Sequence, residues 1–183
     1  MVYLFLAPGF EEIEALCPLD LLRRAGVAVT TVAIGTPSTA VEGAHGITVL
    51  ADITEAEYDL DAPAEMLILP GGMPGAANLD SSAAVDAAIA HAVRTGAYLA
   101  AICAAPMILG HRGLLYGRTA TCFPGFEGEL AGAELAAARV VCDGKIITAA
   151  GMGVALDFGL ALVAALCGEE KAAALRAAVQ ASA

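Results

Sequence analysis

Short apolar runs alternate along the chain with longer segments of helical character. Val2–Ala7, Met66–Pro70 and Leu99–Ile102 are nearly continuous apolar runs, which is typical of parallel strands covered on both faces. Glu11–Ala25 has acidic residues in its first turn and arginines in its last, as the helix dipole favours. Strands that alternate with helices in this way predict an α/β fold with a mostly parallel sheet.

No internal repeat or linker divides the chain, so residues 1–183 are expected to form a single domain. The remaining elements are predicted from the same patterns. Further strands are predicted at Val27–Ile34, Gly46–Ala51, Thr119–Cys122, Ala138–Cys142 and Lys145–Ala149, the last two joined by a hairpin signal at Asp143-Gly144. Further helices are predicted over Ala83–Val93 with Asp80 as N-cap, over Pro106–Gly110, from Gly151 to Leu166, and over Glu169–Gln180.

Three loops follow predicted strands or lead into predicted helices at the same end of the sheet. They are Pro8–Glu14, Gly71–Gly75 and Cys103–Pro106. Ligands of open α/β sheets bind beyond the carboxyl ends of the strands. The sequence therefore predicts that these three loops meet there and form the functional site.

Cys103 lies between a predicted strand and a predicted helix. The positive end of a helix dipole lowers the pKa of a thiol, so this position predicts a thiolate at neutral pH. The alternative is an inert cysteine, because free cysteines are among the most buried residues. The convergence of the three loops favours the reactive cysteine.

Two backbone amides and one acid are candidates for assisting Cys103. The N–H groups of Gly72 and Ala104 would form an oxyanion hole, although a Gly-Gly pair alone is as typical of a tight turn, and no P-loop lysine follows it. Among Glu11, Glu12 and Glu14, one acid held protonated would donate to the thiolate. The other two are expected to be solvated, and spacing alone does not choose among the three.

The histidines offer no evident partner for a Cys-His dyad, which requires hydrogen-bond contact. His91 is expected on a solvated helix face, and His111 follows a helix end. His45, in a loop or at a strand edge, is the one candidate that merits attention.

Composition excludes several classes of partner. Lys+Arg number 9 against Asp+Glu 20, giving a net charge of −11, which argues against nucleic acid and anionic membranes. The N-terminus lacks the features of a signal peptide, and no apolar run is long enough for a membrane span. The 5 cysteines form no C-x-x-C pair, which favours a reduced, cytoplasmic protein without a zinc ribbon. No metal-ligand spacing or cofactor fingerprint is present, so neither is expected.

Five blocks of the sequence, in order, resemble the signature of the DJ-1/ThiJ/PfpI superfamily, and most closely its clade of DJ-1 and YajL. The blocks are Gly9-Phe-Glu-Glu-Ile-Glu14, Leu69-Pro-Gly-Gly72, Ala100-Ala-Ile-Cys-Ala-Ala-Pro106, Thr121-Cys-Phe-Pro124 and Thr148-Ala-Ala-Gly-Met-Gly153. The resemblance implies a flavodoxin-like three-layer α/β/α sandwich, a homodimer, and Cys103 on a strand-cysteine-helix nucleophile elbow. It also implies Glu14 as the protonated acid beside the thiol, and Gly72 and Ala104 as backbone donors.

Departures from the wider superfamily narrow the expected chemistry. Ala104 replaces the histidine that follows the cysteine in PfpI-type proteases, and no histidine follows His111, where glutaminase relatives place theirs. Phe123 stands where many DJ-1 proteins have histidine, and His45 falls about where some have an arginine near the site. Protease and amidotransferase activities are therefore not expected, and no general base beyond Glu14 is identified.

The resemblance implies two roles for Cys103. The first is cofactor-independent chemistry on small α-oxoaldehydes or their protein adducts, of the glyoxalase or deglycase type, with Glu14 moving a proton. The second is a redox sensor or redox-regulated chaperone that responds through oxidation of Cys103. An inert core cysteine is the third alternative.

Overall fold

The computed structural model describes residues 1–181. Its main sheet has seven strands in the order β10-β11-β7-β6-β1-β2-β5. Every neighbouring pair is parallel except β10 (Val140–Asp143) with β11 (Ile146–Ala149). The other strands of this sheet are β1 (Val2–Leu6), β2 (Val29–Ala33), β5 (Ile53–Thr54), β6 (Met66–Leu69) and β7 (Tyr98–Ile102).

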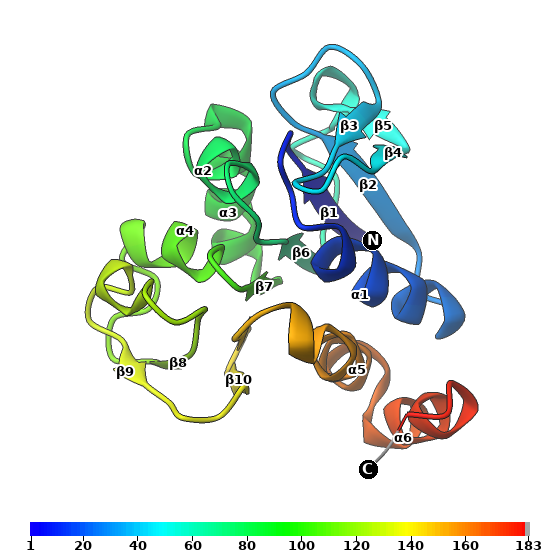
Figure 1. The fold of residues 1–183 in the computed structure, drawn as a ribbon, viewed down its shortest axis with the longest axis vertical. Helices are drawn as coiled ribbons and strands as arrows, with labels where there is room; N and C mark the ends of the chain where they lie inside the picture. The colour runs from blue at the N-terminus through cyan, green and yellow to red at the C-terminus, as the bar shows by residue number, and fades with distance from the viewer. Residues whose placement is uncertain (182–183) are drawn as a thin grey trace.

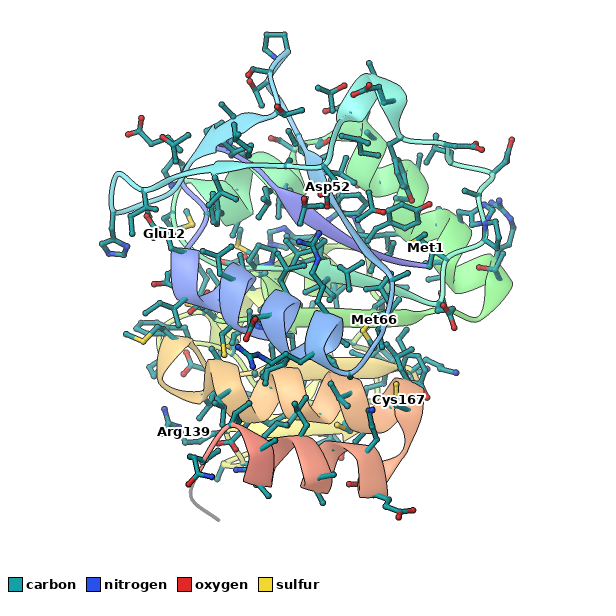
Figure 2. All side chains as sticks on the ribbon, turned by 90° about the vertical axis from the view of Figure 1, so that its right-hand side faces the viewer. Met1, Glu12, Asp52, Met66, Arg139 and Cys167 are labelled. Carbon is teal, nitrogen blue, oxygen red and sulfur yellow. The ribbon has the colours of Figure 1, made fainter. Side chains whose placement is uncertain are left out.

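Helices cover both faces of this sheet (Figure 1). One face carries α1 (Glu12–Arg24), α5 (Ala155–Cys167) and α6 (Glu169–Ala178), seen in front in Figure 2. The other carries α2 (Gly75–Asp80), α3 (Ala83–Thr95) and α4 (Pro106–His111). The predicted three-layer α/β/α sandwich is confirmed.

Alternation along β1 explains how one strand supplies two cores. Leu4 and Leu6 belong to the apolar cluster beneath α1 and α5, whereas Tyr3 and Phe5 belong to the cluster beneath α2, α3 and α4. Successive side chains of a strand point to opposite faces. A strand buried on both faces therefore has to be apolar at every position, as the sequence of β1 is.

Two of the predicted strands belong to small separate sheets. The predicted Gly46–Ala51 strand is β4 (Thr48–Leu50), which pairs with β3 (Ala40–Glu42). The predicted Thr119–Cys122 strand is β8 (Thr119–Ala120), which pairs with β9 (Glu134–Leu135). Short 3-10 turns occupy Glu55–Glu57, Glu127–Glu129 and Met152–Val154.

Asp80 is not an N-cap, contrary to the prediction. It is the last residue of α2, a helix that the sequence pattern does not predict. Ser82 caps α3 instead, because its side chain accepts a hydrogen bond from the N–H of Val85 at 3.3 Å. The Asp80 carboxylate pairs with Arg112 and His111 from the end of α4.

Within residues 1–181 no helix combines the length and the hydropathy needed to span a bilayer. All five cysteines are free.

Candidate functional site

Cys103 has the backbone conformation of a nucleophile elbow. It links β7 to α4 and has a φ of 65°, which non-glycine residues seldom adopt. Its N–H donates to the carbonyl of Ala149, and its carbonyl accepts from the N–H of Phe123, both at 2.8 Å. These two bonds hold the strained turn in place, and strain of this kind is concentrated at functional sites.

Gly71 lets the three predicted loops meet. A Cβ atom there would stand 2.6 Å from the Cβ of Cys103 and 2.9 Å from the carbonyl oxygen of Ile102. With no side chain, its N–H reaches Oε2 of Glu14 at 3.0 Å and its carbonyl accepts from the N–H of Glu11 at 2.9 Å. The glycine at the end of β6 therefore joins the start of α1 to the cysteine elbow.

Glu14 is the acid that contacts the cysteine. Its side chain is only 1% exposed and is hydrogen-bonded to the Cys103 side chain. Burial raises its pKa from 4.5 to about 7, helped by the nearby negative charge of Glu11. The hydrogen bond to Cys103 and the N–H groups of Gly71 and Met152 act in the opposite direction and offset part of that rise.

The Cys103 thiol does not have the lowered pKa that its position predicted. Burial, and then the charge and hydrogen bond of Glu14, raise its pKa to about 12. The N–H groups of Gly72 and Ala104 hydrogen-bond to the sulfur and lower the pKa, but by less. The helix that follows, α4, has only 6 residues and begins three residues after Cys103, so its dipole is too short and too distant to outweigh burial.

The two groups titrate as a pair. Near pH 7 the first proton leaves the pair, and the second leaves only near pH 12, because two negative charges in contact repel each other. In between, the pair holds one negative charge and one proton, with the charge mainly on Glu14, because the pKa of Glu14 is the lower of the two. A thiolate is then available whenever the shared proton lies on Glu14.

Glu12 is buried, which corrects the expectation that it is solvated. It is 3% exposed at the start of α1 (Figure 2). Its carboxylate accepts from the backbone N–H of His45 at 2.7 Å and lies 2.8 Å from His45 Nδ1. This contact raises the pKa of His45. Glycines at positions 43 and 46 give the turn that carries His45, and they are the sequence signal that could have revealed this pair.

Glu11 caps α1, its side chain accepting from the N–H of Glu14 at 2.7 Å. Within residues 1–181, Glu11, Glu12 and His45 form the one group whose side-chain atoms, all within 4.8 Å, come close enough to share a metal ion. Each has another role, because Glu11 caps the helix and Glu12 already bonds His45.

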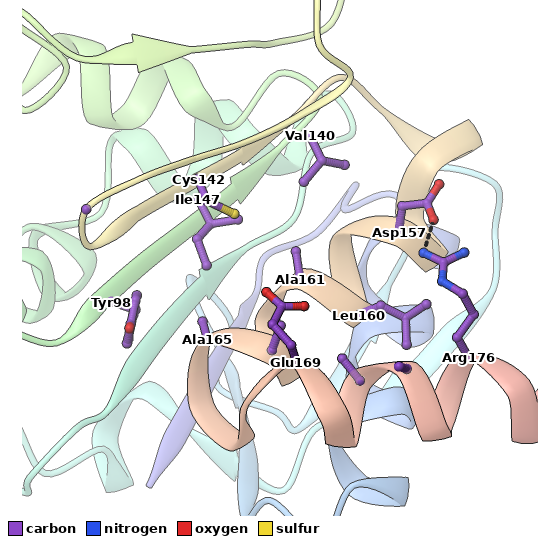
Figure 3. A pocket seen from close by; sticks show the side chains of 14 residues that line it. Tyr98, Val140, Cys142, Ile147, Asp157, Leu160, Ala161, Ala165, Glu169 and Arg176 are labelled. Atoms are coloured by element: carbon purple, nitrogen blue, oxygen red, sulfur yellow. Dashed lines mark hydrogen bonds and ion pairs between the residues drawn. The ribbon is translucent and has the colours of Figure 1, made fainter. Parts of the chain in front are cut away.

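A large cavity lies away from Cys103. It has a volume of about 560 Å³ and lies between the β10–β11 hairpin and the helices α5 and α6 (Figure 3). Cys142, Ala161 and Glu169 are among the residues that line it, and an ion pair between Asp157 and Arg176 closes one end. Neither Cys103 nor Glu14 lines it, so this cavity is separate from the cysteine site.

A family model described as the DJ-1/PfpI family matches residues 1–165. The chain belongs to the DJ-1/PfpI family.

Relatives in this DJ-1/PfpI family match nearly the whole chain. It is 39% identical over 173 residues to Protein DJ-1 homolog B of Arabidopsis thaliana, covering 91% of this chain but 38% of that protein. It is 35% identical to the Parkinson disease protein 7 homolog of Danio rerio, covering 94% of this chain and 92% of the relative. The chain thus spans well under half of the plant protein and almost all of the fish one.

Solved structures of DJ-1 proteins have the same fold. An alanine mutant of a DJ-1 superfamily protein from Salmonella typhimurium is 36% identical with a TM-score of 0.93, covering 100% of this chain and 98% of that one. Oxidized Toxoplasma gondii DJ-1 is 32% identical with a TM-score of 0.94 over the same shares. The flavodoxin-like fold expected from the resemblance is confirmed.

In this DJ-1/PfpI-family chain the four predicted site residues, Cys103, Glu14, Gly72 and Ala104, lie together. His91 is on α3, bonded to Arg94, and His111 pairs with Asp80 and Glu129, so neither belongs to the site. In the sequence, Phe123 stands out only as a departure from the family pattern. Its N–H bonds the carbonyl of Cys103, which belongs to a separate segment of the chain, and local sequence does not reveal such a contact.

Proposed function

We propose that this protein converts small α-oxoaldehydes to 2-hydroxy acids through Cys103, with Glu14 as the proton-transfer residue. The observation that carries the proposal is the hydrogen bond between a buried acid whose pKa is about 7 and a cysteine thiol. An acid with a pKa near neutrality accepts and returns a proton at the pH of the cell. One relative, 29% identical over 163 residues, is named a glutathione-independent glyoxalase, DJR-1.2 of Caenorhabditis elegans.

The proposed reaction needs no oxidant and no cofactor. The sulfur of Cys103 adds to the aldehyde carbon and forms a hemithioacetal, whose oxygen takes up a proton. Glu14 then removes the hydrogen of that carbon as a proton and returns it to the neighbouring carbon, which turns the hemithioacetal into a thioester. Water cleaves the thioester, so the sum is one aldehyde and one water giving one hydroxy acid.

In the proposed reaction the backbone donors act both before and after the substrate adds. The N–H groups of Gly72 and Ala104 bond to the sulfur in the free protein, so they favour the thiolate before the substrate arrives. After addition has formed the carbon–sulfur bond, we expect the same N–H groups to stabilise the negative charge that develops on the former aldehyde oxygen. Protein adducts of the same aldehydes are proposed as a second substrate class, because they present the same carbon atom.

The test is lactate formation from methylglyoxal by the wild type, Cys103→Ser and Glu14→Gln. We expect lactate from the wild type and at least a hundredfold slower formation by either variant, the usual scale of lost acid–base catalysis. Cys142→Ser, which changes a thiol outside the site, is the control and should keep full activity. Equal rates in all four proteins would overturn the proposal.

Redox sensing through Cys103 is the second candidate. The same protonated Glu14 would donate a hydrogen bond to an oxidised sulfur and so stabilise a sulfinate. If the wild type forms no lactate, mass spectrometry after mild peroxide decides the matter. Oxidation confined to Cys103 supports the sensor, whereas oxidation spread over all five cysteines counts against it. The five free thiols are also our reason for proposing a reducing compartment, the cytoplasm.

A further inference from the structure

Phe123 differs from the other phenylalanines of the chain. Phe5, Phe10 and Phe158 are fully buried and Phe126 packs against a core cluster, but Phe123 is 47% exposed. A single exposed apolar residue needs no explanation in general. This one follows Cys122 in the segment whose backbone is bonded to the cysteine elbow, so its position relative to the site matters.

The ring of Phe123 forms one wall of the site. Its N–H donates to the carbonyl of Cys103 at 2.8 Å. Its ring carbons Cδ2 and Cε2 lie 3.0 and 3.6 Å from the point where a Cβ of Gly151 would stand, and Oε1 of Glu14 lies 3.8 Å from the same point. The half-exposed ring and the buried carboxyl group therefore lie close together, both beside Gly151, whose missing side chain lets the ring approach.

The surroundings of the Phe123 ring favour contact with an uncharged, apolar substituent. Met152, which follows Gly151 and bonds Glu14 through its N–H, is 49% exposed and extends the apolar surface. Three carboxyl groups, those of Glu11, Glu12 and Glu14, lie at the N-terminal end of α1 beside the site. A substrate with a negatively charged substituent would be repelled by that group of acids.

We propose that Phe123 determines substrate specificity, and that the site selects α-oxoaldehydes whose substituent is apolar and preferably aromatic. This inference rests on the proposed function. While the aldehyde carbon is bonded to Cys103, the substituent packs on the ring of Phe123 and leaves water. Methylglyoxal offers one methyl group for this contact, whereas phenylglyoxal offers a ring, and a pair of aromatic rings gains more than its buried area alone provides.

The test is the ratio of kcat/KM for phenylglyoxal to that for methylglyoxal. We expect the wild type to favour phenylglyoxal, and Phe123→Leu to lower the ratio about five- to tenfold, the scale of one lost aromatic contact. Methylglyoxal turnover should stay within about twofold, since a methyl group gains little from the ring. Phe123→Tyr keeps the ring and should keep the ratio.

Tyr116→Leu is the matched control. It removes an exposed aromatic ring that packs against Gly132, away from Cys103, and should leave the ratio unchanged. If Phe123→Leu slows both substrates equally, the ring has only a structural role and the specificity proposal is overturned. An unchanged ratio overturns it as well.

A second measurement separates this proposal from the proposed function. If the wild type turns over neither aldehyde, the proposed function fails, but the wall can still be tested by alkylation of Cys103. The sulfur displaces bromide from 2-bromoacetophenone or from bromoacetone, and mass spectrometry gives both rates. The same drop in the ratio of the two rates in Phe123→Leu supports the aromatic wall, and its absence contradicts it.

Discussion

The charged forms of Glu14 and Cys103 are both disfavoured in the folded protein, and burial is the main cause for each. Burial raises the pKa of Glu14 to about 7 and that of Cys103 to about 12. A fully protonated pair is neutral, so the fold tolerates it best at low pH. The charge that chemistry requires at neutral pH therefore has a cost in stability.

The pH dependence of stability tests this cost. Because the pKa of Glu14 is raised from 4.5 to about 7, the folded chain holds a proton that the unfolded chain has released. The contribution of Glu14 to stability therefore falls as the pH rises from about 4.5 to about 7 and is level above that range. Glu14→Gln removes this fall, so the loss of unfolding free energy between pH 5 and pH 8 should shrink by on the order of 3 kcal/mol.

Urea unfolding at pH 5 and pH 8 measures this difference. Glu170→Gln, a change on the exposed surface of α6, should leave the difference as it is in the wild type. If Glu14→Gln has the same pH dependence as the wild type, Glu14 is not protonated in the folded protein, and its part in the proposed reaction is lost as well.

For single residues, the sequence predicted which groups meet better than it predicted how deeply they are buried. The bond between Glu14 and Cys103 follows from the resemblance together with loops that meet at one sheet edge. The raised pKa of Cys103 and the burial of Glu12 were not predicted. Both depend on how much water the folded chain excludes, and residue type and spacing do not report it.

At the scale of elements, apolar runs were the dependable signal. Each continuous run became a central strand, because a strand between two helical layers is apolar on both sides. One strand of each small sheet was predicted, β4 and β8, but their partners β3 and β9 and the helix α2 were not. Their partners are distant segments, such as Thr119–Ala120 beside Glu134–Leu135, and two-residue strands carry no periodic pattern of their own.

The contact between α1 and α5 places Glu14, and one glycine permits it. A Cβ at Gly159 of α5 would stand 2.6 Å from Cδ1 of Leu21 and 3.0 Å from Cα of Pro18. Gly159→Val should therefore destabilise the protein by about 2 kcal/mol, because the two helices have to separate. Ala161→Val, on the same helix, adds two carbons on the side facing the large cavity and should cost little.

The midpoint of urea unfolding measures both valine variants. A second readout is the rate at which Cys103 is alkylated at pH 7, which should change in Gly159→Val, because α1 carries the acid of the site, and not in Ala161→Val. If both variants lose stability equally, the effect is that of a β-branched residue in a helix and not of the contact with α1.

At the scale of the whole molecule, charge is the dominant property. A net charge of −11 on 183 residues excludes no fold, but it opposes any association of the chain with itself. Exposed apolar side chains, such as Ile13 on α1 and Met152 in the 3-10 turn before α5, favour association. The homodimer that the family resemblance implies is therefore proposed as a balance between the two.

Because charge repulsion opposes the proposed dimer, association should depend on the salt concentration. Screening shortens the range of repulsion from about 30 Å at 0.01 M to about 8 Å at 0.15 M ionic strength, so the dimer should be favoured as salt is added. Light scattering at micromolar concentration should give twice the chain mass of 18.3 kDa at 0.15 M salt, with a smaller average mass at 0.01 M. A mass of one chain at both salt concentrations would remove the homodimer. A dimer that is equally stable at both would show instead that the acidic residues face away from the interface, leaving apolar contacts to decide the association.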